Sequence, residues 1–238
     1  IRDRLKPDFP SAYYYRGKSK VELRDFLGAE FDFNKVIELK PDYRNAYFSR
    51  GFTKIELKDY LGGIADYTNA IKYDSDNPDV YYNRGVAKGK LKDYQGALAD
   101  YTKAIEFRHY FSDAYINRGL VKGELKDYLG AIADYTKAIE LEPYDTNAYF
   151  NRGNVKFDLQ DYRGAVADYT KSIDLKHDFS QAYYYRARAK DELNDFLGAV
   201  ADFTKAIEFK PDYADSFFRR GLIKLLIGIK AVSYTHLT

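Results

Sequence analysis

The pair Arg-Gly recurs at a fixed interval of 34 residues along almost the whole chain. Its glycine is Gly17, Gly51, Gly85, Gly119, Gly153 and Gly221, with Ala187 in the remaining place. A fixed period of this length predicts stacked copies of one supersecondary unit, each of which buries its apolar face against its neighbours. The length of 238 residues therefore indicates a number of repeats and not a number of globular domains.

The unit can be numbered from Ser112 to Asp145 as positions 1 to 34, and the same position in another unit lies a multiple of 34 residues away. We expect a first helix, helix A, to be N-capped at position 1 by Ser112, Thr146 or Ser180 and to run to about Leu125. Aspartate occupies position 16 in six of six units, where its side chain can cap a second helix, helix B. The caps of helix B are Asp25, Asp59, Asp93, Asp127, Asp161 and Asp195.

Helix B carries a single apolar stripe. In the reference unit its members are Tyr128, Ala131, Ile132, Tyr135, Ala138 and Ile139. Their spacing of three and four residues places them on one helix face, so we expect them in the core. Proline at Pro41, Pro143 and Pro211 cannot continue the helix and predicts a turn to the next unit.

Small residues at positions 8, 20 and 27 let two helices approach closely, while aromatic rings at positions 4, 17 and 24 fill the space beside them. With the 34-residue period and proline at position 32, this pattern resembles the tetratricopeptide repeat (TPR) family over about residues 11–226. The resemblance implies an all-α fold, a right-handed α-solenoid of antiparallel helix-turn-helix units. Position 7 departs from the usual leucine because it is arginine in all seven helices A, and position 11 is lysine in place of the usual tyrosine.

The register divides the chain into repeats. We expect the end of a preceding repeat in 1–9, repeats 1 to 6 in 10–43, 44–77, 78–111, 112–145, 146–179 and 180–213, helix A of a seventh repeat in 214–228, and a tail in 229–238. The chain has no methionine, and its first residues echo the end of a repeat, so we expect a fragment. Residues 232–238 resemble a translated sequencing adaptor, and we expect this tail to be non-native.

The arginine at position 7 shares its helix face with positions 4, 8 and 11, so it should point toward packed neighbours and need a partner. Position 23 supplies an aspartate in each helix B. We predict a structural ion ladder, within a repeat or between neighbouring repeats, formed by Arg50, Arg84, Arg118, Arg152 and Arg186 with Asp66, Asp100, Asp134, Asp168 and Asp202. The alternative is an anion-binding stripe, which the equal number of acids disfavours.

The family resemblance implies that helices A line a concave groove with positions 2, 5, 6, 9, 12 and 13. At position 5 the groove would then carry Tyr14, Phe48, Tyr82, Ile116, Phe150, Tyr184 and Phe218. At position 6 it would carry Asn83, Asn117 and Asn151. Asparagine can bond a peptide backbone while rings cover the side chains, which suits a protein or an extended peptide as partner. The alternative for the position 5 rings is packing between adjacent helices.

Several other functions are disfavoured by composition. The formal net charge of +2 gives no field for nucleic acid or an anionic membrane, although an aromatic row could stack single-stranded bases. The sequence contains no apolar run long enough to cross a bilayer. Absent cysteine fits a reducing cytosol and a periplasm equally, so the compartment stays open. Position 5 is never basic, so the carboxylate clamp by which some TPR proteins bind chaperone tails is not expected.

We expect no enzyme, cofactor or metal site. His109 and His177 both replace the turn proline and lie two repeats apart, and no acid pair accompanies a nucleophile or a phosphate-binding loop. The sequence therefore predicts a non-enzymatic scaffold that binds a protein or peptide through helices A. The alternative is the recruiting or regulatory arm of a larger enzyme or signalling protein.

Overall fold

The computed structural model describes residues 9–235, and in this range the chain is all helical. The helices are α1 (Pro10–Glu22), α2 (Phe26–Leu39), α3 (Arg44–Glu56), α4 (Tyr60–Tyr73), α5 (Pro78–Lys90), α6 (Tyr94–Phe107), α7 (Ser112–Glu124), α8 (Tyr128–Leu141), α9 (Thr146–Asp158), α10 (Tyr162–Leu175), α11 (Ser180–Glu192), α12 (Phe196–Phe209) and α13 (Ala214–Thr235). Odd-numbered helices are helices A and even-numbered helices are helices B. The all-α prediction is confirmed.

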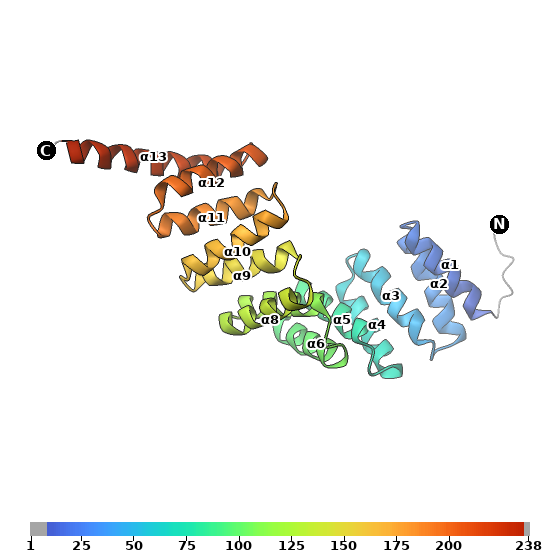
Figure 1. Ribbon diagram of the computed structural model, residues 1–238. Coiled ribbons are helices and arrows are strands. Elements are labelled where there is room, and N and C mark those ends of the chain that lie inside the picture. Colours follow the sequence, from blue (N-terminus) through green and yellow to red (C-terminus); the bar gives the residue numbers. More distant parts are fainter. Residues whose placement is uncertain (1–8, 236–238) are drawn as a thin grey trace. The chain divides into compact units, whose positions relative to one another are not determined.

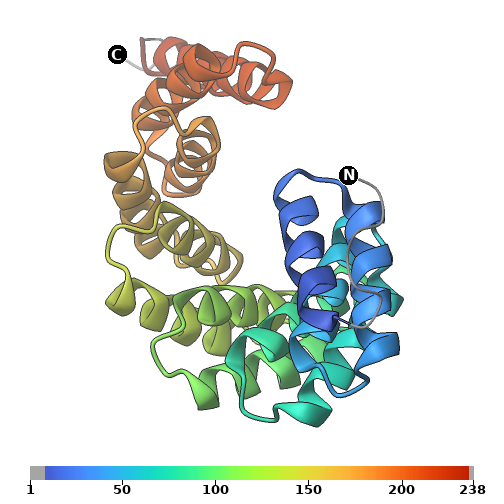
Figure 2. The same cartoon turned by 90° about the vertical axis from the view of Figure 1, so that its right-hand side faces the viewer.

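The helices pack as consecutive antiparallel pairs. In both views α1 lies beside α2 and α11 lies beside α12, each pair being joined by a short turn (Figures 1 and 2). The chain divides into two compact units, the first ending at Leu125 and the second beginning at Lys126. The first unit holds α1 to α7 and the second holds α8 to α13.

Each helix B begins as the sequence predicts. The Asp93 side chain accepts a hydrogen bond of 3.0 Å from the Gly96 backbone amide, and the other five position 16 aspartates make the same contact. The residue before each aspartate turns the chain with a left-handed backbone, with φ between 59° and 65°. These residues are Arg24, Lys58, Lys92, Lys126, Gln160 and Asn194.

The expected caps of helix A at position 1 are wrong. Ser112, Thr146 and Ser180 are already the first helical residues, because the helix begins one residue earlier than the pattern suggested. The capping place falls on position 34, where Asp145 accepts from two backbone amides, whereas Phe111 and Phe179 have no capping side chain. The capping residue of helix A therefore stands at position 34, one residue before the predicted position 1.

The last helix runs on where the others stop. α13 continues to Thr235, although the repeat register places a turn after its first 14 residues. Position 16 is Ile229 and not aspartate, so nothing caps a second helix, and Gly228 at the turning position keeps a negative φ. The predicted tail therefore begins inside a helix, while residues 1–8 and 236–238 of the predicted end segments lie outside the described residues.

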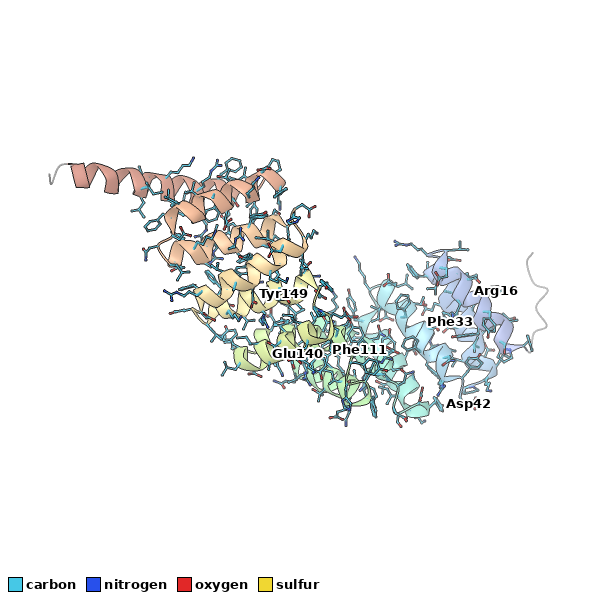
Figure 3. The ribbon with its side chains drawn as sticks, viewed as in Figure 1. Arg16, Phe33, Asp42, Phe111, Glu140 and Tyr149 are labelled. Atoms are coloured by element: carbon cyan, nitrogen blue, oxygen red, sulfur yellow. The ribbon has the colours of Figure 1, made fainter. Side chains whose placement is uncertain are left out.

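Close approach of the two helices in a repeat depends on the glycine at position 8. A methyl group added at Gly85 would lie 2.9 Å from the ring of Tyr101, and one added at Gly153 would lie 2.7 Å from the ring of Tyr169. The position 24 ring thus packs directly on the glycine. Figure 3 labels Arg16 and Phe33, which come from the two helices of the first such pair.

Candidate functional site

An ion network joins helix A to helix B inside each of five repeats. Arg84 donates from Nε and Nη2 to both carboxylate oxygens of Asp100, at 2.9 and 2.6 Å, and Lys88 Nζ lies 2.8 Å from Oδ2 of the same carboxylate. The corresponding arginine pairs are Arg16–Asp32, Arg50–Asp66, Arg152–Asp168 and Arg186–Asp202. All five contacts are within a repeat, which was one of the two geometries left open by the sequence.

The same arginines also reach the preceding repeat. Nη1 of Arg152 donates to Thr136 at 3.0 Å, and Nη1 of Arg186 donates to Thr170 at 3.1 Å. Arg118 makes this contact with Thr102 at 3.3 Å and lies over the ring of Tyr115, 5.4 Å from its centroid. Asp134, at position 23, is buried in the second unit. The guanidinium donors are engaged by the protein itself, so they are not offered to a ligand.

The position 5 rings are wedged between other rings of the stack. Tyr82 lies 5.9 Å from the ring centroid of Tyr101 and 4.8 Å from that of Phe111. Phe150 has three such neighbours, Tyr184 is 5 % exposed, and only Phe218 is largely open, at 66 %. Most of this row therefore forms the floor of the helix A surface and contributes little exposed side chain.

The position 6 asparagines use part of their amide on the helix. Asn83 Nδ2 donates to the backbone carbonyl of Asp79 at 2.7 Å. Asn117 Nδ2 donates to the carbonyl of Asp113 at 3.0 Å and to the hydroxyl of Tyr82 at 2.9 Å. What remains available on Asn83 and Asn117 is mainly the acceptor oxygen.

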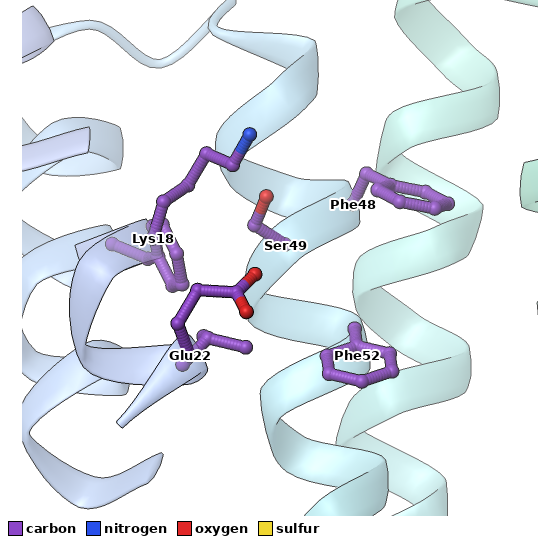
Figure 4. A pocket seen from close by; sticks show the side chains of 7 residues that line it. Lys18, Glu22, Phe48, Ser49 and Phe52 are labelled. Carbon is purple, nitrogen blue, oxygen red and sulfur yellow. The ribbon is translucent and has the colours of Figure 1, made fainter. Parts of the chain in front are cut away.

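Grooves lie between successive helices A, and their residues recur at the same repeat positions. The first lies between α1 and α3 and has a volume of about 140 Å³ (Figure 4). Phe33, Phe48 and Phe52 give it an apolar floor, whereas Lys18 and Glu22 supply opposite charges at its edge. This groove suits an apolar side chain flanked by polar backbone.

The second groove lies between α5 and α7 and is larger, about 410 Å³. Its lining residues are Tyr82, Val86, Gly89, Lys90, Tyr94, Tyr101, Asn117, Leu120, Val121 and Glu124. Burial raises the pKa of Tyr101 above the usual value of a phenol, with a smaller contribution from Tyr82, so its hydroxyl remains protonated at neutral pH.

The third groove lies between α9 and α11 in the second unit, with a volume of about 240 Å³. Asn154 accepts a hydrogen bond of 2.9 Å from the buried Tyr169 hydroxyl, and Asp158 lies on the rim. The guanidinium of Arg188 lies over the rings of Phe157, Tyr184 and Tyr185 at 4.8, 5.8 and 5.5 Å. Cation–π contacts of this kind hold the cation in place and leave its edge free to donate.

Comparisons with known proteins decide the family. Models of the tetratricopeptide repeat match residues 54–92, 78–111, 112–145 and 150–214, which together make up more than half of the sequence. The chain is a TPR protein. No curated protein matches it in sequence.

Solved TPR structures share this fold at low identity. A tetratricopeptide repeat protein from Parabacteroides merdae is 20% identical, with a TM-score of 0.75, covering 91% of this chain and 86% of its own. YrrB, described as a TPR protein with an unusual peptide-binding site, is 21% identical, with a TM-score of 0.69 and coverage of 79% and 97%. MamA from Desulfovibrio magneticus is 19% identical, with a TM-score of 0.68 and coverage of 72% and 97%.

Of the residues proposed from the sequence for the TPR groove, Phe48 lines the first cavity, and Tyr82 and Asn117 line the second. None of the proposed residues lines the third, and Asn83, Ile116 and others line none of the three. The residues that give each cavity its character stand at positions 9 and 12, such as Phe52, Val86, Gly89 and Phe157. The sequence pattern did not single them out, because these positions differ from repeat to repeat. The signal that could have identified them is the variation at positions 9 and 12 in a repeat that is otherwise regular.

The described residues hold neither a helix that could span a membrane nor a cluster of metal ligands. In residues 9–235, no helix has both the length and the apolar character that a bilayer span requires. Across the same residues, no three or more His, Cys, Asp and Glu side chains gather as metal ligands would. His109 and His177 lie in the turns before α7 and α11.

Proposed function

We propose that this TPR chain is a non-enzymatic scaffold that binds an extended peptide segment of a partner protein along its helices A. The supporting observation is the recurrence of a groove lined by positions 6, 9, 12, 13 and 24 at three separate places, α1/α3, α5/α7 and α9/α11. Each groove combines an aromatic floor with polar groups at its edge, which suits a peptide with side chains directed inward and backbone toward the rim.

The ion network supports peptide binding along helices A, because it disfavours the alternative that the arginines bind an external anion. Asp100 carries both Arg84 and Lys88, and both cations are mostly buried against helix B. A cation already paired with a buried carboxylate offers little to an external anion. We therefore assign the ladder a structural role and place partner binding on the opposite edge of helix A.

The three grooves differ in chemistry, and this difference would set the partner sequence. The first is apolar with opposite charges at its edge, the second has tyrosine hydroxyls, and the third has a ring-stacked Arg188 beside Asp158. Specificity would come from side chains that match each groove in turn, because a mismatched polar group buried without a partner is costly.

The test is selection of peptides from a random displayed library on the full chain, followed by affinity measurement of synthetic copies by fluorescence anisotropy. The groove variant replaces Phe52 and Leu120, which are 38% and 43% exposed, by serine. The matched control replaces Leu27 and Leu61, each 72% exposed on helix B, by serine. We expect the groove variant to lose about tenfold or more in affinity and the control to change little.

Circular dichroism of both variants checks that they remain folded. Equal loss of affinity in the two variants would contradict the proposal, as would selected peptides that bind with unchanged affinity to the groove variant.

A further inference from the structure

One hydroxyl that lines the second groove has no hydrogen-bond partner among the described residues. Tyr101 is 3% exposed as a whole residue, but its hydroxyl faces the cavity, and no described residue forms a hydrogen bond with that hydroxyl. The equivalent Tyr169 donates to Asn154 at 2.9 Å. The difference lies at position 9, which is asparagine in repeat 5 and Val86 in repeat 3. Because this hydroxyl lies at the cavity and not in the closed core, it can form a hydrogen bond with a group that enters the groove.

The space in front of this hydroxyl exists because Gly89 has no side chain. Position 12 is Val21, Ile55 and Phe157 in repeats 1, 2 and 5 but glycine in repeat 3. A methyl group added at Gly89 would meet nothing closer than the Tyr101 hydroxyl, at 3.9 Å. The cavity of about 410 Å³ therefore opens directly onto the unpaired group.

A second hydroxyl converges on the same space. The Tyr82 oxygen accepts a hydrogen bond from Asn117 Nδ2, so its own proton remains free to donate, and the Asn117 oxygen remains free to accept. The surrounding walls include the apolar Val86 and Leu120 and the ring of Tyr94, and the charged Lys90 and Glu124 also line the cavity. An apolar side chain placed here would leave the hydroxyls dry and unpaired, whereas one with a polar tip would satisfy them.

We propose that the cavity at Gly89 is the anchor site for a tyrosine side chain of the partner peptide. The ring would pack among Tyr82, Tyr94 and Leu120, and its hydroxyl would both accept from Tyr101 and donate to Asn117. A phenol fits this set because it accepts and donates at one atom, which phenylalanine and leucine cannot do. This inference rests on the proposed function, of which it names one specificity site.

The test uses small probes on the full chain, so that it does not depend on knowing the partner. N-acetyl-tyrosinamide, N-acetyl-phenylalaninamide and N-acetyl-lysinamide are titrated into isotope-labelled protein and followed by the amide signals of Gly89 and Asn117. We expect the tyrosine probe to bind about five- to tenfold more tightly than the phenylalanine probe, from the hydrogen bonds that only the phenol makes.

Three variants locate the effect. Gly89→Phe, which copies Phe157 of repeat 5, should fill the cavity and abolish binding. Val86→Asn, which copies Asn154, should pair the Tyr101 hydroxyl internally and, like Tyr101→Phe, reduce the preference for tyrosine. Gly123→Phe is the matched control, since Gly123 holds the same position in α7, does not line this cavity and has open space around it.

The proposal is overturned if the tyrosine probe does not bind, if both aromatic probes bind equally, or if Gly123→Phe abolishes binding as Gly89→Phe does. Preference for the lysine probe would also overturn it and indicate a site for cations. Failure of the peptide-groove proposal would look different, because the tyrosine probe would bind at Gly89 while selected peptides remained insensitive to Phe52 and Leu120.

Discussion

Repeats 3 and 5 keep the same contacts between their own two helices and differ on the surface that faces the next helix A. In repeat 3 Arg84 lies 2.6 Å from Asp100, and in repeat 5 Arg152 lies 2.7 Å from Asp168. Positions 9 and 12, in contrast, change from valine and glycine to asparagine and phenylalanine. The contacts within a repeat must satisfy the same geometry each time, whereas positions 9 and 12 of the groove take no part in those contacts and can vary.

We call the arginine, lysine and aspartate network that joins the two helices of a repeat its internal frame. The largest expected effect tests whether this frame contributes equally to stability in repeats 3 and 5. Asp100→Ala and Asp168→Ala each leave an arginine and a lysine, with side chains only 16–20% exposed, without their carboxylate. Removing one partner of a buried charge network commonly costs about 3–5 kcal/mol. We expect similar losses in both repeats, measured by urea unfolding of each variant.

The control for this pair is Glu106→Ala, which removes an exposed contact with Lys103 and should cost much less. Clearly unequal losses of unfolding free energy for Asp100→Ala and Asp168→Ala would show that the ion network is not equivalent in the two repeats. The contrast between a constant internal frame and a variable groove would then be weaker.

A reciprocal exchange at position 9 tests the groove itself. Asn154→Val should leave the Tyr169 hydroxyl buried and unpaired, and such a group costs about 1–3 kcal/mol. Val86→Asn should be neutral or stabilising, because it offers Tyr101 the partner that Tyr169 already has. Urea unfolding of the two variants gives the comparison directly, and losses of equal size would mean that the Tyr101 hydroxyl already has a partner.

Close packing on the glycine of position 8 should matter in both repeats but not at the end of the stack. Gly85→Ala and Gly153→Ala place a methyl group against a tyrosine ring, and this overpacking, partly offset by better helix propensity, should cost about 1 kcal/mol. Gly221→Ala, which meets nothing within 4 Å, should be neutral or stabilising. Ala187 shows that the ring of Phe203 can adjust, so a loss well above this would be unexpected.

The frame could be predicted from the sequence because it repeats. Every helix A carries arginine at position 7 and every helix B carries aspartate at position 23, seven and six residues respectively. Aspartate at position 16 capped each helix B as expected. The caps of helix A were misplaced by one residue, because position 1 and position 34 both precede the apolar pattern and serine favours either. Repetition thus indicates which residues pair inside a repeat, but it does not fix the first residue of every helix.

The groove was less predictable for a physical reason. Whether Tyr101 is satisfied depends on Val86 and Gly89, neither of which is a polar group that a search for functional residues would select. The position 5 rings were weighed as both groove and packing residues, and the distance of 4.8 Å between the rings of Tyr82 and Phe111 shows how much of that surface is used inside the stack. A missing side chain such as that of Gly89 is visible in one sequence only as variation at a position of the repeat.

The smallest expected effect concerns position 12 of repeat 6, where Asp191 stands in place of an apolar residue or glycine. Burial raises the pKa of Asp191, and Glu192 raises it further, while Arg219 acts in the opposite direction. A carboxyl group whose pKa is higher in the folded chain stabilises the fold below its unfolded pKa, and this stability is lost as the pH rises through the folded value. Asp191→Asn should therefore stabilise the protein slightly at neutral pH, because the Asp191 side chain is only partly buried, and the gain should vanish at about pH 3, below the usual pKa of an aspartate. Urea unfolding at the two pH values measures this, and Glu192→Gln should give a smaller gain in the same direction.

An asparagine variant with the pH dependence of the unmodified chain would mean that position 12 can hold a charge without cost. The contrast between a constrained frame and a variable groove would then be stronger than proposed.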